Sequence, residues 1–357
     1  MVTTSEFLQY CTKTSTRQTY TSALRTYLRI TLDTPIPKDS LNQKWILYLN
    51  SGRNIWQDLL QFPEKGKNLH LSPKTINLYL QVILLYLGDC GIIVEPQKLR
   101  RLRKRCPKNY PLTHDTILTC GTIQTLLQHA DTRQRAEILI AVSSGVRIGE
   151  LLRVTFDDID LTTTPAEIHI PAAITKNETP RTTFISSEAA EALQDWLIVR
   201  KDRSSMRGKN PDTDNRIFPY SPAHESKKFQ HLLKKSGKHQ IDPNTRRSLI
   251  HFHSFRKFFL TEFKLAASAE VAEELAGHTG YLSGSYRRLS KQDMQEEYRK
   301  AEPRLTITTN ASNTSRRTHP SYLHQEMQRI TAELEQIQTE YRILCARISA
   351  ESASLEE

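Results

Sequence analysis

The sequence predicts a mainly α-helical protein with a small antiparallel β-sheet, which is an α+β architecture. Three patterns in the 357 residues indicate this fold class. Apolar residues recur at helical spacing in the first part of the chain. A stretch between residues 167 and 185 alternates between apolar and polar residues in the manner of a β-hairpin. Near the C-terminus an apolar residue recurs every three or four positions, which indicates one more long helix.

Residues 1–96 are expected to form a small helical bundle. A capping signal followed by the helical spacing of Leu24 and Leu28 predicts one helix in this region. Two further helices are expected over residues 41–49 and 73–87, where apolar residues dominate. The pattern alone leaves the purpose of this bundle open.

Composition favours a nucleic acid as the first candidate partner, because the formal net charge is +11. The five cysteines are scattered without Cys-x-x-Cys spacing, which argues for reduced thiols and against a zinc site or a disulfide framework. No N-terminal segment combines a basic start with an apolar core, so a secretion signal is not expected. The longest apolar stretch, residues 79–87, is too short to cross a bilayer. We expect a cytoplasmic protein that binds neither a membrane nor a metal.

Five polar residues stand in short segments that follow one another in the second half of the chain. The segments are Ser-Ser-Gly-Val-Arg-Ile-Gly-Glu around Arg147, His-Ser-Phe-Arg from His253 to Arg256, Leu-Ala-Gly-His ending at His278, and Gly-Ser-Tyr-Arg-Arg around Tyr286. Each segment alone occurs by chance, but their order, with Lys176 in the hairpin between the first two, is specific. This set resembles the active site of the tyrosine recombinases, the phage integrase family, and the run from Tyr286 to Leu289 is most similar to archaeal and archaeal-virus integrases.

The chemistry of DNA cleavage explains why these residue types are needed. A five-coordinate phosphorus carries extra negative charge on its non-bridging oxygens, and preorganised donors aimed at that charge supply the largest catalytic contribution. Arginine stays charged and meets two phosphate oxygens at once, so Arg147 and Arg256 suit this task without a metal. A tyrosine phenol titrates near ~10, so it needs a base or a charged phosphate site to lose its proton.

The resemblance implies a role for each residue of the set. Tyr286 is the expected nucleophile, with Tyr281 as the alternate. Lys176 is a candidate general acid for the leaving 5′ oxygen. His253 and His278 can accept or relay a proton and can donate to the phosphate.

The neighbouring Glu150 is expected to brace the basic groups. A structural explanation exists for each of these residues as well. A lysine at a hairpin tip is usually soluble surface, and His253 and Arg256, three residues apart on a helix, form a pair that is often structural.

The resemblance, together with composition and the C-terminal heptad spacing, divides the chain into five segments. They are a helical core-binding domain at residues 1–96, a basic interdomain linker at 97–111, a catalytic domain at 112–307, a flexible linker at 308–320 and a coiled-coil helix at 321–350. The linker carries seven basic residues and no acidic one between Lys98 and Lys108. Such a run can be a nuclear-import signal or a plain tail. Between two DNA-binding domains we expect a strap along the phosphate backbone.

Candidate DNA contacts lie in the first two segments. They are Arg17, Arg25, Lys74, Arg100, Arg101, Arg103, Lys104 and Arg105. A run of charges is usually only a solvated face, so these residues are the least specific part of the set.

The C-terminal apolar stripe spans between three and four heptads, from Leu323 to Ile348. Its g positions are acidic, at Glu326, Glu333 and Glu340, whereas the e positions between them are neutral. Charge therefore does not favour a parallel self-pair. An antiparallel pair, docking on a neighbouring subunit and a helix folded back on its own domain all remain open.

The implied function is a site-specific DNA recombinase that integrates or excises a mobile element, such as an archaeal virus or plasmid, through a 3′-phosphotyrosine. No cofactor is implied, because the bond energy is kept in the phosphotyrosine. The expected partners are double-stranded DNA and further copies of the chain, as a tetramer on DNA, at the nucleoid; an accessory DNA-bending protein is an open possibility. The alternatives are a transposase, a dimer resolvase or a type IB topoisomerase with the same chemistry, and a non-catalytic oligomeric DNA-binding protein.

Overall fold

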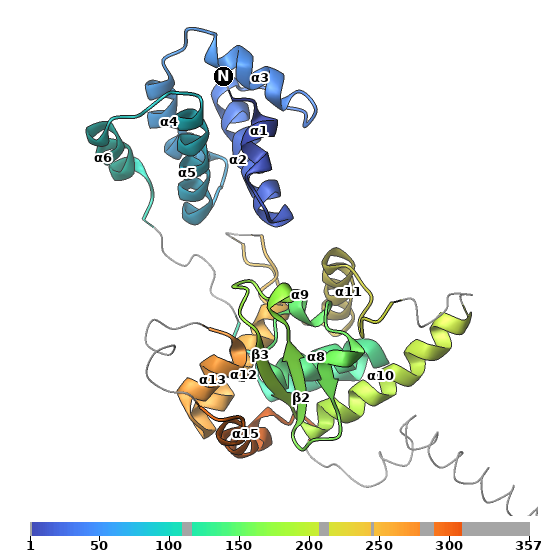
Figure 1. Ribbon diagram of the computed structural model, residues 1–357. Coiled ribbons are helices and arrows are strands. Elements are labelled where there is room, and N and C mark those ends of the chain that lie inside the picture. The colour runs from blue at the N-terminus through green and yellow to red at the C-terminus, as the bar shows by residue number, and fades with distance from the viewer. Residues whose placement is uncertain (1, 109–115, 207–213, 244–245, 279–288, 309–357) are drawn as a thin grey trace, which may run out of the picture. The chain divides into compact units, whose positions relative to one another are not determined.

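The computed structural model describes residues 2–108, 116–206, 214–243, 246–278 and 289–308 (Figure 1). The chain divides into two compact units, one formed by residues 1–114 with 242–247 and one by residues 115–241 with 248–357. The expected coiled-coil helix at residues 321–350 and both candidate nucleophilic tyrosines lie outside the described residues. In the described part of the chain, no helix combines the length and the apolar character that a membrane crossing requires.

The first unit is helical throughout its described elements. These are α1 (Thr4–Gln9), α2 (Thr14–Leu32), α3 (Leu41–Leu49), α4 (Ile55–Asn68), α5 (Pro73–Asp89) and α6 (Pro96–Arg105). The expected helices at 41–49 and 73–87 are confirmed as α3 and α5. The helix α4, which begins after the capping side chain of Asn54, was not expected from the sequence.

An aromatic core holds this unit together. The rings of Tyr27 and Trp45 stack with centroids 5.5 Å apart, and Phe62 and Tyr86 complete the cluster. All four side chains are buried, so they contribute much of the apolar area that leaves water on folding.

The basic segment corrects one expectation. Most of the predicted linker at residues 97–111 is the helix α6, which begins with Pro96 in its first turn. Leu102 is buried in the core of the first unit, and the Cys106 thiol donates to the Leu102 carbonyl at 3.4 Å. A regular helix with one apolar anchor therefore lies where the sequence predicted a linker, and its role along the phosphate backbone stays a prediction.

The second unit places a small sheet among helices. Its described elements are α7 (Cys120–His129), α8 (Thr132–Ser144), α9 (Ile148–Leu151), η1 (Phe156–Asp158), β1 (Ile159–Asp160), β2 (Ala166–Ile170), η2 (Ala172–Ile174), β3 (Arg181–Ile185), α10 (Ser187–Met206), α11 (Pro222–Lys235), α12 (Phe252–Ala266), α13 (Ala269–Ala276) and α15 (Lys291–Leu305). The sheet has the antiparallel order β1-β2-β3, and Ala166 pairs with Ile185. The predicted fold class and hairpin are confirmed.

The helix α8 is the centre of the second unit. Nearly all of its side chains are buried, and it contacts α10, α12 and β3 (Figure 1). Because α8 is enclosed by these elements, the turn at its C-terminal end is held from several sides. The first residue of the candidate site follows this turn.

Candidate active site

Arg147 is positioned by the turn that ends α8. Gly145 caps the helix in the left-handed conformation, with φ 63°. A Cβ atom at Gly145 would also overlap the ring of Phe259, so this position needs glycine for two reasons. The chain then becomes extended, and Arg147 is the N-cap residue of the short helix α9.

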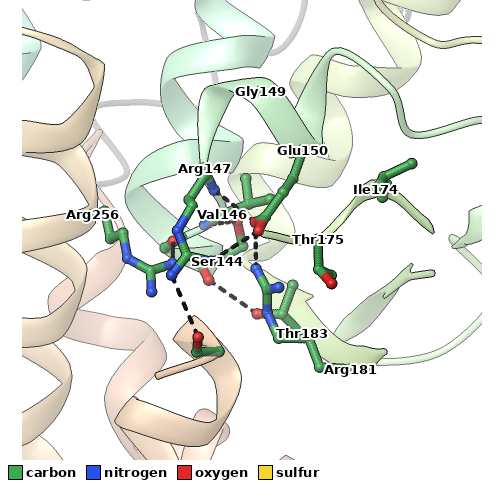
Figure 2. Close-up of polar contacts among 12 residues, drawn as sticks. Ser144, Val146, Arg147, Gly149, Glu150, Ile174, Thr175, Arg181, Thr183 and Arg256 are labelled. Atoms are coloured by element: carbon green, nitrogen blue, oxygen red, sulfur yellow. Dashed lines mark hydrogen bonds and ion pairs between the residues drawn. The ribbon is translucent and has the colours of Figure 1, made fainter. Parts of the chain in front are cut away.

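Glu150 holds Arg147 in place (Figure 2). The Arg147 Nη1 donates to Glu150 Oε1 at 2.8 Å, and the Arg147 backbone N–H donates to Oε2 at 3.2 Å. The Arg147 side chain keeps 27% of its surface exposed, whereas Glu150 keeps 2%. The bracing contact that the sequence predicts for Glu150 is therefore present.

Arg256 is a buried cation with unused donors. It lies on α12 with 1% of its surface exposed, and its Nη1 donates to the Gly145 carbonyl at 2.7 Å. Its Nε and Nη2 have no hydrogen-bond partner among the described residues. Burial, and then the positive charges of Arg147 and Arg181, lower the pKa of Arg256 to about 10. The group stays charged at neutral pH, so an anion beside it would gain strong charge-assisted hydrogen bonds.

His253 precedes Arg256 on α12 and is exposed at the surface of this helix. Burial of part of the ring, and then the charges of Arg256 and other neighbours, lower the pKa of His253. A lowered pKa favours the neutral imidazole at physiological pH, which can accept a proton. The ring of His251 lies 6.2 Å away and is held by Ser254.

His278 follows Gly277, the left-handed cap of α13, with φ 71°. The His278 Nδ1 contacts the Glu273 carboxylate, which also binds Lys264. Burial alone would raise the pKa of Glu273, but the hydrogen bonds from Lys264 and His278 lower it. Arg147 Nη2 reaches the Gly277 carbonyl at 3.4 Å, so the first and third predicted segments meet here.

Lys176 is exposed in the turn between β2 and β3. The start of this turn is tied to α9, because Arg153 donates from Nη2 to the Ile174 carbonyl at 2.6 Å and from Nε to the Gly149 carbonyl at 2.7 Å. Gly149 lies two residues after Arg147. Arg153 thus connects the turn that carries Lys176 to the helix that Arg147 caps.

The tyrosines separate into two groups. Tyr281 and Tyr286 lie outside the described residues. Tyr298 on α15 is fully buried, and its hydroxyl donates to the Ser143 carbonyl at 2.9 Å. Burial raises the pKa of Tyr298 well above the ordinary value of a phenol. Tyr298 is therefore a core residue and unsuited to attack a phosphate.

Arg181 contributes to the site although its sequence context did not predict this. This first residue of β3 is buried, and its Nη2 donates to Glu150 Oε2 at 2.6 Å (Figure 2). The only available signal was a basic residue at the start of a strand whose other positions are apolar or threonine.

The candidate DNA-binding side chains of the first unit differ in whether they are exposed or already donate hydrogen bonds within the protein. Arg25 donates from Nε and Nη2 to the Ile36 carbonyl at 3.0 and 2.8 Å, and Arg17 donates to the Cys11 carbonyl at 3.2 Å. Lys74 is exposed on α5. The predicted basic residues of α6 are all exposed on that helix: Arg100, Arg101, Arg103, Lys104 and Arg105.

Known proteins are similar to this chain over much of its length. The model of the phage integrase family matches residues 116–283, a range that includes all the candidate catalytic residues except Tyr286. The tyrosine recombinase XerC of Shewanella sp. (strain ANA-3) is 27% identical over 273 residues, which is 72% of this chain and 82% of that protein. These similarities support a tyrosine-type site-specific recombinase. The function of the chain is therefore site-specific DNA recombination, as the ordered residues predicted.

Further relatives of this tyrosine recombinase come from bacteria and archaea. XerC of Haemophilus ducreyi is 32% identical over 49% of this chain and 54% of that protein. XerA of Pyrococcus horikoshii is 23% identical over 70% of this chain and 82% of that protein. Among solved structures, a Tn1549 transposon integrase variant in complex with transposon right end DNA has a TM-score of 0.52 at 17% identity and covers 78% of this chain and 98% of that chain. This likeness shows the fold.

Proposed function

We propose that this tyrosine recombinase is the integrase of a mobile element, and that Tyr286 attacks a DNA phosphate held by Arg147 and Arg256. One observation carries the proposal. Arg256 is buried and charged, yet two of its guanidinium nitrogens have no hydrogen-bond partner among the described residues. Unpaired donors on a buried cation cost free energy, roughly a few kcal/mol, so a function that supplies an anion explains why the arrangement persists.

The two arginines stabilise the charge of the transition state in this proposal. Glu150 directs Arg147, and the Gly145 carbonyl fixes one end of Arg256, so little reorganisation is needed when the charge develops. Their free donors then meet the non-bridging oxygens of the scissile phosphate. The carboxylate of Glu150 is shared with arginines, so it acts as a brace and not as a base.

The proton transfers follow from the remaining residues. The Tyr286 oxygen forms a bond to phosphorus while the bond to the 5′ oxygen breaks. Lys176 donates a proton to the leaving 5′ oxygen, and neutral His253 accepts or relays the phenol proton. His278 donates to the phosphate from the loop that Glu273 supports. The 5′ hydroxyl of a partner strand reverses the step, so neither a nucleotide cofactor nor a metal is required for energy.

Double-stranded DNA is the proposed partner, and α6 is the proposed phosphate-binding helix of the first unit. Its exposed basic residues stand on a helix anchored by Leu102, so their spacing is fixed. Their contribution should be independent of sequence and sensitive to salt. Among the other candidates, Arg25 and Arg17 already donate to backbone carbonyls, so the exposed Lys74 is the stronger of the remaining proposals.

We further propose that the chain acts as a tetramer on DNA and that the segment at residues 321–350 links subunits. An apolar heptad stripe needs a partner surface, because an isolated helix of this length is marginal in water. Removing residues 321–357 should preserve cleavage of a single site but weaken oligomer formation and recombination between two sites. The variant Leu334→Lys with Ile337→Lys should behave like the truncation. Identical light scattering and recombination for all three proteins would mean that the helix packs on its own chain or is dispensable, and either result would overturn the proposed link between subunits.

A suicide substrate built from the attachment site of the element tests the proposed function. A nick beside the scissile phosphate makes the fragment with the free 5′ hydroxyl short, so that it diffuses away after cleavage. The strand that is joined to the tyrosine then stays trapped as the covalent complex. Trapping on this site, with exchange between two such sites, would support an integrase. Relaxation of supercoiled DNA without a preferred site would instead identify a type IB topoisomerase activity. The archaeal affinity of the segment from Tyr286 to Leu289 stays a prediction, which the flanking DNA of the gene would test.

A further inference from the structure

Arg181 closes a ring of contacts that joins three parts of the site. Its Nη2 donates to Glu150 Oε2 at 2.6 Å, and its Nε donates to the Leu275 carbonyl at 3.0 Å. Glu150 holds Arg147, and Arg147 reaches the Gly277 carbonyl at 3.4 Å. Leu275 and Gly277 lie two residues apart, so the backbone completes the ring.

Arg181 is too deeply placed to meet DNA itself. Its side chain keeps 5% of its surface exposed, and both acceptors that it reaches are protein oxygens. A Cβ atom at Gly277 would come within 2.8 Å of the Arg181 side chain, so the loop before His278 packs directly on the guanidinium. The shape of this loop therefore depends on Arg181.

We propose that Arg181 is a positioning residue for catalysis, which sets the direction of Arg147 through Glu150 and the place of His278 through Leu275 and Gly277. The inference rests on the proposed role of Arg147. A planar guanidinium serves two acceptors at a fixed angle, and the single ammonium of lysine does not reproduce this geometry. A site held to within about 0.5 Å requires such support behind the residues that touch the substrate.

The charge state of Glu150 is a second consequence. Burial alone would raise the pKa of Glu150, but the hydrogen bond and charge of Arg181, and then Arg147, lower it. When Arg181 is replaced by a neutral side chain, the pKa of Glu150 rises. Glu150 then takes up a proton at a higher pH than in the wild type and releases Arg147.

The experiment compares Arg181→Met and Arg181→Lys with Arg133→Met, a matched control. Arg133 is another buried arginine, which pairs with Glu137 and Glu225 away from the ring. Single-turnover cleavage of a suicide substrate, DNA affinity and thermal melting are measured from low to high pH. Arg181→Met should slow cleavage by about 10²-fold, the usual effect of a misplacement of about 1 Å. Its DNA affinity should not change. The acid limb of its rate profile, which is the fall in cleavage rate as the pH is lowered, should move to higher pH.

The other variants make the result decisive. Arg181→Lys should recover part of the rate and shift the acid limb less, and it keeps the test valid if Arg181→Met does not fold. Arg133→Met should melt at a lower temperature while its rate and acid limb stay those of the wild type. Wild-type rate and acid limb in both Arg181 variants would overturn the proposal. Arg147→Gln separates the two hypotheses, because a fully active Arg147→Gln would refute the proposed function itself.

Discussion

Two buried clusters of arginine and glutamate lie in the second unit, and they balance their charges in opposite ways. In the first cluster, Arg133 is shared by Glu137 and Glu225. In the second, Glu150 is shared by Arg147 and Arg181, and Arg256 adds a further cation. One cluster has an excess of carboxylates and the other has an excess of guanidinium groups.

The two clusters differ in whether they can lose their excess charge at neutral pH. Burial raises the pKa of Glu137 well above its ordinary value, so the first cluster can become neutral by binding a proton. An arginine with a pKa of about 10 does not lose its proton at neutral pH, so the second cluster keeps its positive charge. A cluster that neutralises itself is structural, whereas one that stays charged is suited to bind an anion.

The largest effect is expected from the nucleophile that would act on such an anion. Tyr286→Phe should abolish the covalent complex, because the phenylalanine ring has no oxygen to attack phosphorus. DNA affinity should persist, since one hydroxyl contributes little to the electrostatic binding of DNA. A gel that resolves covalent complexes from free protein measures this. A normal covalent band in Tyr286→Phe and its loss in Tyr281→Phe would reverse the assignment.

Exchanging one arginine in each cluster sharpens the comparison. Arg256→Met should slow cleavage by about 10³-fold or more, the scale of a lost donor or arginine in a charged transition state. Its melting temperature should stay equal or rise, because a buried cation with unpaired donors is removed.

The opposite result is expected for Arg133→Met. This variant should lose about 3–5 kcal/mol of stability. The buried Glu225 carboxylate loses its ion-pair partner, and Glu137 loses a hydrogen-bond donor. Its cleavage rate, measured below the melting temperature, should remain that of the wild type. Calorimetry and single-turnover kinetics on the same samples check both variants. Equal losses of stability and rate in the two variants would remove the distinction between the clusters.

Replacing Lys176 should slow cleavage less than replacing Tyr286, and a modified substrate should restore most of the lost rate. Lys176→Ala should slow cleavage of ordinary DNA by about 10²–10⁴-fold, the usual range for general acid catalysis. A substrate with sulfur at the bridging 5′ position should restore most of this loss, because a thiolate leaves without protonation. Equal defects on both substrates would show that Lys176 does not protonate the leaving group.

The smallest expected effect is on the pH dependence of protein stability, through Glu137 of the first cluster. A carboxyl whose pKa is raised in the folded state stabilises the fold at low pH, and this contribution is lost as the pH rises toward the folded pKa. Glu137→Gln carries a permanently neutral side chain, so its melting temperature should fall less than that of the wild type as the pH rises. Parallel melting curves for the two proteins across pH would show that Glu137 is ionised in the fold.

The sequence predicted individual helices and the hairpin, because these elements depend on residues that are close together in the chain. The bounds of α3 and the start of α5 follow from apolar spacing and from Pro73 in the first helical turn. The β2–β3 hairpin follows from the alternation of apolar and polar residues in β2 and from the turn residues between the two strands. The ordered polar residues predicted one shared site. In the structure Arg147 donates to the Gly277 carbonyl and Arg256 donates to the Gly145 carbonyl, while the roles of these residues stay a prediction.

Two kinds of feature could not be predicted from the sequence. The first depends on contacts between residues far apart in the chain, and the second is a segment whose composition suggests a different structure. Arg181 contacts Glu150 and Leu275, which are 31 and 94 residues away in the chain, and no local pattern records such contacts. The helix α6 was interpreted as a linker because its charges dominate, although Leu102 anchors it in the core. A single buried leucine in a basic run is a weak signal, and only the packing around it makes the helix evident.

The central claim, that Arg256 and its neighbours bind the scissile phosphate, is tested most directly by removing the charge from the phosphate. A methylphosphonate at the scissile position replaces one charged non-bridging oxygen with a methyl group. The ratio of the wild-type cleavage rate to that of Arg256→Met is measured on this substrate and on ordinary DNA. The ratio should fall steeply on methylphosphonate DNA, since there is less charge for Arg256 to stabilise. The same ratio on both substrates would contradict the claim, because Arg256 would then support the protein and not the phosphate.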